Sequence, residues 1–137
     1  MRLPIGEPGE SPVEAAKQYI RRGQRRLAIE LLEPWVEDYP ADADAWSVLA
    51  AAQFELDNFS GAVQAARRAV ELKPSARNWC NLGMVLRKLG QLYEAERAQY
   101  KALVVDSGYE RARTELRKIH EIRTGRRARH RQRFDDM

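Results

Sequence analysis

The chain has 137 residues, of which 44% are apolar or aromatic and 32% are charged, and its net charge is +4. These values are typical of one folded domain, and no apolar run approaches the ~20 residues that a membrane span requires. The single cysteine, Cys80, excludes an internal disulfide, and no apolar stretch follows the first arginine. We therefore expect a cytoplasmic protein without a signal peptide.

The first ten residues contain two prolines and two glycines, which predict an extended N-terminal arm at 1–10 rather than a helix. The sequence SPVE at Ser11–Glu14 then predicts a capping box, with proline in the first helical turn. A helical domain is therefore expected from residue 11 onwards.

Several kinds of residue recur along the chain every 33 or 34 positions, which indicates a structural repeat. The spacing predicts three units at about 9–42, 43–75 and 76–109, each with two helix-length segments of 3.6-residue periodicity. The first unit is the most degenerate, because it lacks the tryptophan. The recurring residues are the turn formers Gly23, Asp57 and Gly90, the alanines Ala28, Ala62 and Ala95, the helix-ending positions Pro40, Pro74 and Ser107, and the tryptophans Trp46 and Trp79.

After the third unit, four residues from Tyr109 to Ile119 form one apolar helical stripe with charges elsewhere. This pattern predicts a helix at 109–122 that covers the apolar end of a stacked repeat array. The sequence SGYE at Ser107–Glu110 predicts a capping box at its start. The domain is thus expected to cover residues 11–122, followed by a basic tail at 123–137.

The pattern W-x2-L-G-x2-Y…A…P of the tetratricopeptide repeat family is met most fully by WCNLGMVLRKLGQLYEAE at 79–96, and the chain resembles that family over about residues 9–109. The resemblance implies an all-α fold, a right-handed superhelical solenoid of three antiparallel helix pairs with a capping helix and a basic tail. The chain departs from the family at Gln53 and Leu86, where the family prefers tyrosine.

In this family the first helix of each repeat lines a concave groove that holds partner segments. The resemblance therefore implies a groove with an apolar floor and a basic flank, suited to a partner with apolar anchors and nearby acidic residues. The alternative is that Met84 and Cys80 belong to the repeat core and that the basic residues only keep the surface soluble. The implied groove residues are Val13, Lys17, Ile20, Arg21, Asp44, Ser47, Ala51, Phe54, Glu55, Arg77, Cys80, Asn81, Met84, Arg87, Lys88, Arg111 and Lys118.

The residues that usually carry chemistry are few. The histidines His120 and His130 lie at metal-ligand spacing neither from each other nor from Cys80, and no sequence feature orients a base toward that cysteine. We expect no catalytic residue, no metal, no cofactor and no small-molecule substrate.

Positive charge is concentrated near the C-terminus: residues 1–74 carry a net charge of −3, and residues 75–137 carry +7. Three interpretations of the tail stay open. It is a solvated terminus, an arm that orders on an acidic protein surface, or an arm that contacts nucleic-acid phosphates. The tail arginines are Arg123, Arg126, Arg127, Arg129, Arg131 and Arg133.

The main functional hypothesis is a non-catalytic adaptor or assembly factor that holds a protein segment in the groove. One alternative is an RNA- or ribosome-associated accessory protein whose tail binds phosphates, and another is a small three-repeat secretion chaperone. Family members that clamp a C-terminal carboxylate use five Lys, Asn and Arg positions, of which only Lys17 and Arg77 could serve here. A carboxylate clamp is therefore not expected.

Overall fold

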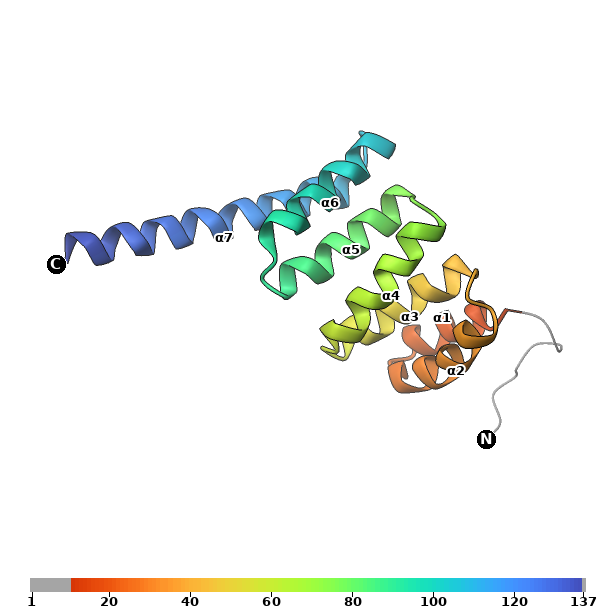
Figure 1. Ribbon diagram of the computed structural model, residues 1–137. Helices are drawn as coiled ribbons and strands as arrows, with labels where there is room; N and C mark the ends of the chain where they lie inside the picture. Colours follow the sequence, from red (N-terminus) through yellow and green to blue (C-terminus); the bar gives the residue numbers. More distant parts are fainter. Residues whose placement is uncertain (1–10, 137) are drawn as a thin grey trace.

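The computed structural model describes residues 11–136, and over that range the chain forms seven α-helices that stack into an elongated array (Figure 1). The arm predicted for residues 1–10 lies outside the described residues. Successive helices pair in antiparallel fashion, so the predicted all-α solenoid of three helix pairs is confirmed. The helices are α1 (Val13–Arg21), α2 (Arg25–Asp38), α3 (Ala43–Glu55), α4 (Phe59–Leu72), α5 (Ala76–Lys88), α6 (Leu92–Val105) and α7 (Glu110–Asp135).

The turn inside each helix pair requires one residue in the left-handed region. Glycine adopts this conformation without a Cβ clash, and aspartate tolerates it better than most residues. The residue after each one donates its amide to a carbonyl five positions earlier, at 2.8–2.9 Å, which closes the helix end. The three left-handed residues are Gly23, Asp57 and Gly90, with φ of 77°, 59° and 78°.

Three helices begin at a residue whose side chain caps the first turn. In each case the side-chain oxygen accepts a hydrogen bond from an exposed backbone amide of that turn, at 3.1 Å. These N-caps are Asp42 for α3, Asn58 for α4 and Ser75 for α5.

The two predicted capping boxes do not form. Helix α1 starts after Pro12 and α7 starts after Tyr109, and neither residue supplies a side-chain cap. At the first site Glu14 does not reach back to the helix start, because its carboxylate pairs with Lys17 at 3.2 Å. Ser11 supplies half of the first motif, because its hydroxyl oxygen accepts from the Val13 amide at 3.4 Å. Neither glutamate returns a hydrogen bond to the helix start, since Glu110 likewise pairs with Arg113, so both predicted boxes were wrong.

Small residues let the two helices of a pair approach closely. The three recurring alanines are fully buried. Between α5 and α6, the Gln99 amide nitrogen donates to the Cys80 carbonyl at 3.0 Å. A Cβ on Gly83 would collide with that amide and would lie 3.1 Å from the Ala95 carbonyl oxygen. Glycine at position 83 therefore makes room for a buried glutamine.

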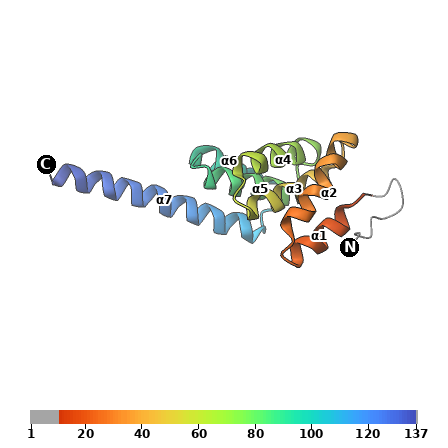
Figure 2. The same ribbon diagram turned by 90° about the horizontal axis from the view of Figure 1, so that it is seen from below.

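The first half of α7 covers the end of the array. Its buried residues Ala112, Glu115 and Ile119 pack against α5 and α6. The helix does not end at residue 122, where the capping helix was expected to stop, but continues to Asp135 and projects beyond the solenoid (Figures 1 and 2). Arginine is a good helix former and no proline interrupts the segment, so intrinsic propensity favours the extension at most positions, Gly125 being the main exception.

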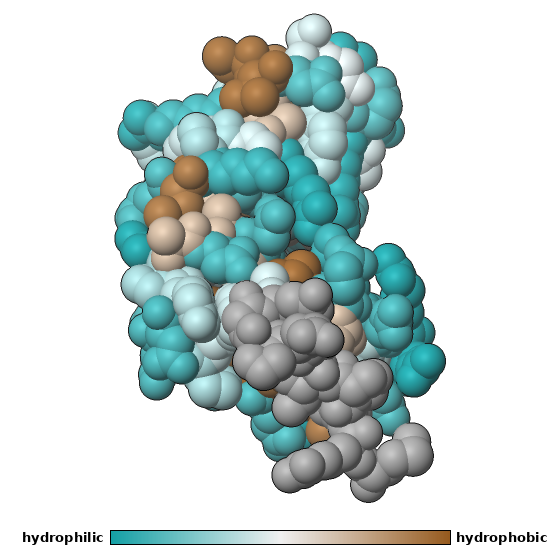
Figure 3. All heavy atoms as spheres, turned by 90° about the vertical axis from the view of Figure 1, so that its right-hand side faces the viewer, coloured by the Kyte–Doolittle hydropathy of each residue, from teal (hydrophilic) through white to brown (hydrophobic). Residues whose placement is uncertain are grey.

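The face of the molecule shown in Figure 3 is largely hydrophilic. On the face shown in Figure 3 hydrophobic residues form small separate patches rather than one continuous area. None of the helices within residues 11–136 combines the length and the apolar composition of a membrane-spanning segment.

Candidate functional site

The first helices of the three pairs form one row. Helix α3 contacts both α1 and α5, and α5 contacts α7, so side chains from four helices meet along the same side of the array. These are the helices that were expected to line a groove.

A cavity of about 230 Å³ lies where α3, α5 and α7 meet. Apolar side chains form one part of its wall, and two arginines, an asparagine and a glutamate form the rest. Most of them were predicted from the sequence. The lining residues are Ala50, Ala51, Phe54, Glu55, Arg77, Asn81, Met84, Val85 and Arg111.

A second hollow of about 350 Å³ adjoins the first, because Ala51 and Arg77 line both. It extends the site toward α1. We call the two together the α1–α7 groove. The second hollow is lined by Lys17, Ile20, Arg21, Val48, Ala51 and Arg77.

The two apolar side chains at the floor of the groove, Phe54 and Met84, pack against residues beneath them. Phe54 is half-buried, and its ring packs edge-on against Phe59 of α4 with ring centroids 5.6 Å apart. Met84 is half-buried as well and also packs against the core cluster that contains Ala112. Both side chains therefore keep part of their surface in the groove while the rest is fixed by packing.

The groove carries an excess of positive charge. Its one acidic lining residue, Glu55, pairs with Arg25 at 2.5 Å. Lys17 pairs with Glu14. Within residues 11–136 no carboxylate pairs with Arg77 or Arg111, and both are exposed. These two guanidinium groups can therefore donate hydrogen bonds to a ligand.

Two of the predicted basic flank residues are engaged elsewhere. Glu115 is only 2% exposed, and it accepts from Arg87 Nε at 2.8 Å and from Lys118 Nζ at 3.0 Å. These contacts join α5 to α7. Arg87 and Lys118 thus stabilise the cap and do not line the groove, and Lys88, although exposed, lines neither hollow.

Cys80 belongs to the core rather than to the groove. Its side chain is fully buried in a cluster with Ala76, Ala102 and Ala112. Burial raises the pKa of the Cys80 thiol to about 11, so the thiol stays protonated at neutral pH and is not an activated nucleophile. The alternative considered from the sequence was therefore right for Cys80 and only partly right for Met84.

Three further predicted residues lie outside the groove. Val13 and Ser47 are buried in the interior. Asp44 is exposed and pairs with Lys73 at 3.6 Å. Conversely, the structure adds Val48, Ala50 and Val85 to the lining. Each lies three or four positions from a predicted residue on the same helix, and that spacing could have identified it.

No group of three His, Cys, Asp or Glu residues within 11–136 is arranged to share a metal ion. The groove offers apolar surface and hydrogen-bond donors, which are the features of a binding site.

Comparisons with known proteins place this geometry in context. The family model described as tetratricopeptide repeat matches residues 43–75 and 76–107, which contain the pairs α3–α4 and α5–α6. No curated protein sequence matches the chain.

Solved structures share the fold over most of the chain. The crystal structure of MamA is 27% identical with a TM-score of 0.77 and covers 82% of this chain, which in turn spans 66% of that one, just under two thirds. The first TPR of Spaghetti (RPAP3), bound to the HSP90 peptide SRMEEVD, is 25% identical with a TM-score of 0.76 over 81% of this chain and 89% of its own. The Yersinia enterocolitica type III secretion translocator chaperone SycD shares the fold alone. It is 15% identical with a TM-score of 0.75 over 82% of this chain and 83% of its own.

The sequence period, the left-handed turn in each helix pair and the matched family model agree with one another. Residues 43–107 match the tetratricopeptide repeat model, and the chain as a whole shares the fold of solved tetratricopeptide repeat structures.

Proposed function

We propose that the protein is a non-catalytic interaction adaptor whose α1–α7 groove holds a partner segment with an apolar anchor and neighbouring carboxylates. The observation that carries this proposal is the cavity in which Phe54 and Met84 lie beside Arg77 and Arg111. Apolar surface and available guanidinium groups meet there in one small space.

The apolar part of the cavity would supply affinity. A leucine- or methionine-sized side chain that covers Phe54 and Met84 loses its water-exposed surface, which contributes on the order of 2 kcal/mol. The rigid support from Phe59 favours this contact, because less side-chain freedom is lost on binding.

The arginines would supply orientation. A guanidinium group donates two parallel hydrogen bonds to a carboxylate, and because both arginines are exposed each such pair contributes at most about 1 kcal/mol. Arg77 on α5 and Arg111 on α7 belong to different helices, so carboxylates at two positions of one segment can be bound. The segment is therefore expected to cross from α5 to α7.

The peptide in the Spaghetti complex, SRMEEVD, combines methionine and valine with three acidic residues. Its composition is the chemistry that this groove favours, which supports an acidic partner segment. We propose internal carboxylates rather than a clamped chain terminus, because only Lys17 and Arg77 match the clamp positions of the family. The likeness to SycD is one of fold and does not favour a secretion chaperone.

The proposal is tested by selecting binders from a random peptide library displayed on phage, with the full chain immobilised. We expect enrichment of peptides that carry one large apolar residue flanked by Asp or Glu. Affinity for the best peptide, measured by titration calorimetry, should fall at least tenfold in Phe54→Ser/Met84→Ser, which corresponds to about 1.4 kcal/mol. Arg77→Glu/Arg111→Glu should have a similar effect.

The matched control is Arg22→Glu/Arg26→Glu, which makes the same charge change at exposed positions outside the groove. It should bind the peptide as the unmodified chain does. Peptides that bind all three variants equally would contradict the proposed site.

A further inference from the structure

The C-terminal half of α7 has a surface that the groove does not use. Arg123 is the last residue anchored to the solenoid, since its Nη1 donates to Glu96 Oε2 of α6 at 2.6 Å. Every residue from Arg126 to Asp136 is exposed, and the segment projects away from the other helices (Figures 1 and 2). A ligand can therefore approach this helix freely.

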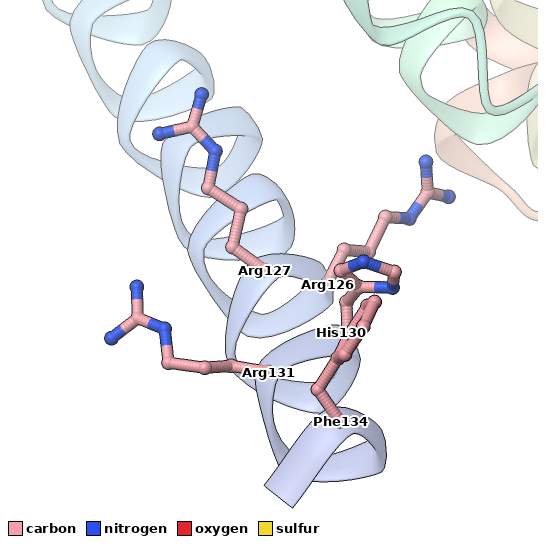
Figure 4. A pocket seen from close by; sticks show the side chains of 5 residues that line it. All are labelled: Arg126, Arg127, His130, Arg131 and Phe134. Atoms are coloured by element: carbon pink, nitrogen blue, oxygen red, sulfur yellow. The ribbon is translucent and has the colours of Figure 1, made fainter.

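The arginines of the projecting segment are not spread evenly around the helix. At 3.6 residues per turn, the five from Arg126 to Arg133 fall within an arc of roughly 200°, with His130 and Phe134 inside it. The opposite side carries Ala128 and Gln132. In Figure 4, Arg127 and Arg131 project to one side of the helix, and Arg126 lies with His130 and Phe134 on the other.

This arrangement is electrostatically unfavourable without a ligand. No acidic residue occurs between Glu121 and Asp135, and within residues 11–136 no ion pair involves the arginines from 126 to 133. Each pair of like charges four positions apart, such as Arg127 and Arg131, destabilises a helix by a few tenths of a kcal/mol. An anionic ligand would relieve that repulsion, so binding and helix formation should be coupled.

The side chains present favour one class of polyanion. A helix that inserts into a membrane surface needs an apolar side opposite its charges, and the only large apolar residue, Phe134, lies among the arginines. A protein interface needs an apolar or aromatic centre, which a single phenylalanine does not provide. A phosphate backbone requires only closely spaced donors, and arginine binds phosphate through two bonds at once.

The geometry points to double-stranded DNA. The major groove of B-form DNA is about 12 Å wide and admits one α-helix, whereas the A-form groove of RNA is too narrow. A basic arc of roughly 200° lets arginines reach the phosphates on both walls of the groove at once. We propose that residues 126–133 of α7 bind the DNA backbone in this way, without selecting a sequence.

The test is fluorescence anisotropy with the full chain and a labelled mixed-sequence DNA duplex of about 20 base pairs, at salt from about 50 to about 200 mM. If four arginines engage phosphates, the slope of log K against log salt is about −3.6, and affinity falls about 150-fold over that range. A second duplex of unrelated sequence should bind equally well.

A rearranged variant separates the shape of the basic arc from simple charge. Q132R/R133Q keeps composition and net charge but distributes the five arginines around the whole helix, with no gap wider than about 100°. It should lower the magnitude of the salt slope by about one and weaken binding about eightfold at about 0.1 M salt. Both positions are exposed, so circular dichroism should show the unmodified solenoid.

The control Arg22→Gln/Arg26→Gln lowers the net charge by two and should leave DNA binding unchanged within a factor of about two. The proposal is overturned if the duplex does not bind at about 0.1 M salt, or if the rearranged variant binds as tightly as the unmodified chain. It is also overturned if poly-glutamate or phosphatidylserine vesicles bind and the duplex does not. Peptide selection by the groove is independent of each of these results.

Discussion

Along α7, the residues from Glu110 to Arg123 include those that pack against α5 and α6, whereas those from Arg126 to Asp135 are all exposed and project beyond the solenoid (Figures 1 and 2). The first half buries three side chains against α5 and α6 and satisfies a buried carboxylate with two cations. The second half exposes every side chain and holds like charges close together.

The two halves differ in what stabilises the helix. Tertiary packing holds the first half, as it does for most helices in proteins, and the second depends on intrinsic propensity alone. A segment of this second kind gains most from a ligand, because binding can supply the contacts that the protein does not. The first half accordingly belongs to the fold, and the second is available for recognition.

The largest expected loss of stability comes from changing Glu115, the residue that fixes the first half of α7 to α5. Glu115→Ala leaves Arg87, which is only 13% exposed, without its partner and should lower the free energy of unfolding by about 3 kcal/mol. Urea denaturation measures this loss. Glu110→Ala, which removes an exposed pair with Arg113, is the control and should change it by less than about 0.5 kcal/mol.

The double variant Arg87→Met/Glu115→Leu sharpens this prediction. It replaces the buried pair by apolar side chains of similar size and should recover most of the stability, because no buried charge is left uncompensated and Lys118 is exposed. A loss below about 1 kcal/mol in Glu115→Ala would show that the first half is not anchored through this residue.

The next largest loss of stability is expected in the helix pair α5–α6, on which α7 packs. Gly83→Ala forces a methyl group into the Gln99 amide and should cost about 2 kcal/mol in urea denaturation. The second repeat has Ala50 and Ala66 at the equivalent positions, so Gly83→Ala/Gln99→Ala should restore much of the loss. If the double variant is no more stable than the single one, the close approach of α5 and α6 is not what position 83 provides.

At the opposite end of the array, Asp42 links α2 to α3. Burial alone would raise the pKa of Asp42, but hydrogen bonds from Trp35, Ala45 and Ser11 outweigh it and lower that pKa below its usual value of 3.8. The carboxylate therefore contributes stability that is fully present above pH 3.8 and is lost as the pH falls through the lower folded value.

Asp42→Ala should thus cost about 1.5 kcal/mol at neutral pH, mainly through the lost helix cap. The difference from the unmodified chain should shrink as the pH falls below 3.8. Thermal unfolding across this pH range measures both. A difference that stays constant down to the lowest pH would mean that the charged carboxylate has no part in the effect.

The smallest effect on stability is expected in the exposed second half of α7. Arg127→Gln/Arg131→Gln should change the free energy of global unfolding by less than about 0.5 kcal/mol. Hydrogen–deuterium exchange should nevertheless show fast exchange at 126–135 and slow exchange at 112–122, with the variant slowing the former at low salt because repulsion falls. Equal protection of both halves would abolish the distinction between them.

The sequence predicts the solenoid well, because each repeat must bury the same few positions and so repeats them. It predicts less well which basic residues near the groove are not already engaged in ion pairs. Arg87 and Lys118 were expected on the flank, but their exposure depends on Glu115, a charged residue that the sequence gives no reason to bury. The length of α7 could have been inferred from the missing proline and the run of good helix formers, although its basic composition suggested a tail.

The central claim is that partner segments bind in the α1–α7 groove, and photo-crosslinking tests it most directly. Phe54 would be replaced by p-benzoylphenylalanine in one protein and the exposed Tyr100 of α6 in another, each incubated with the best peptide from the phage selection. The account predicts a crosslink from position 54 and none from position 100. A crosslink from position 100 alone would place binding on the other side of the array and would contradict the account.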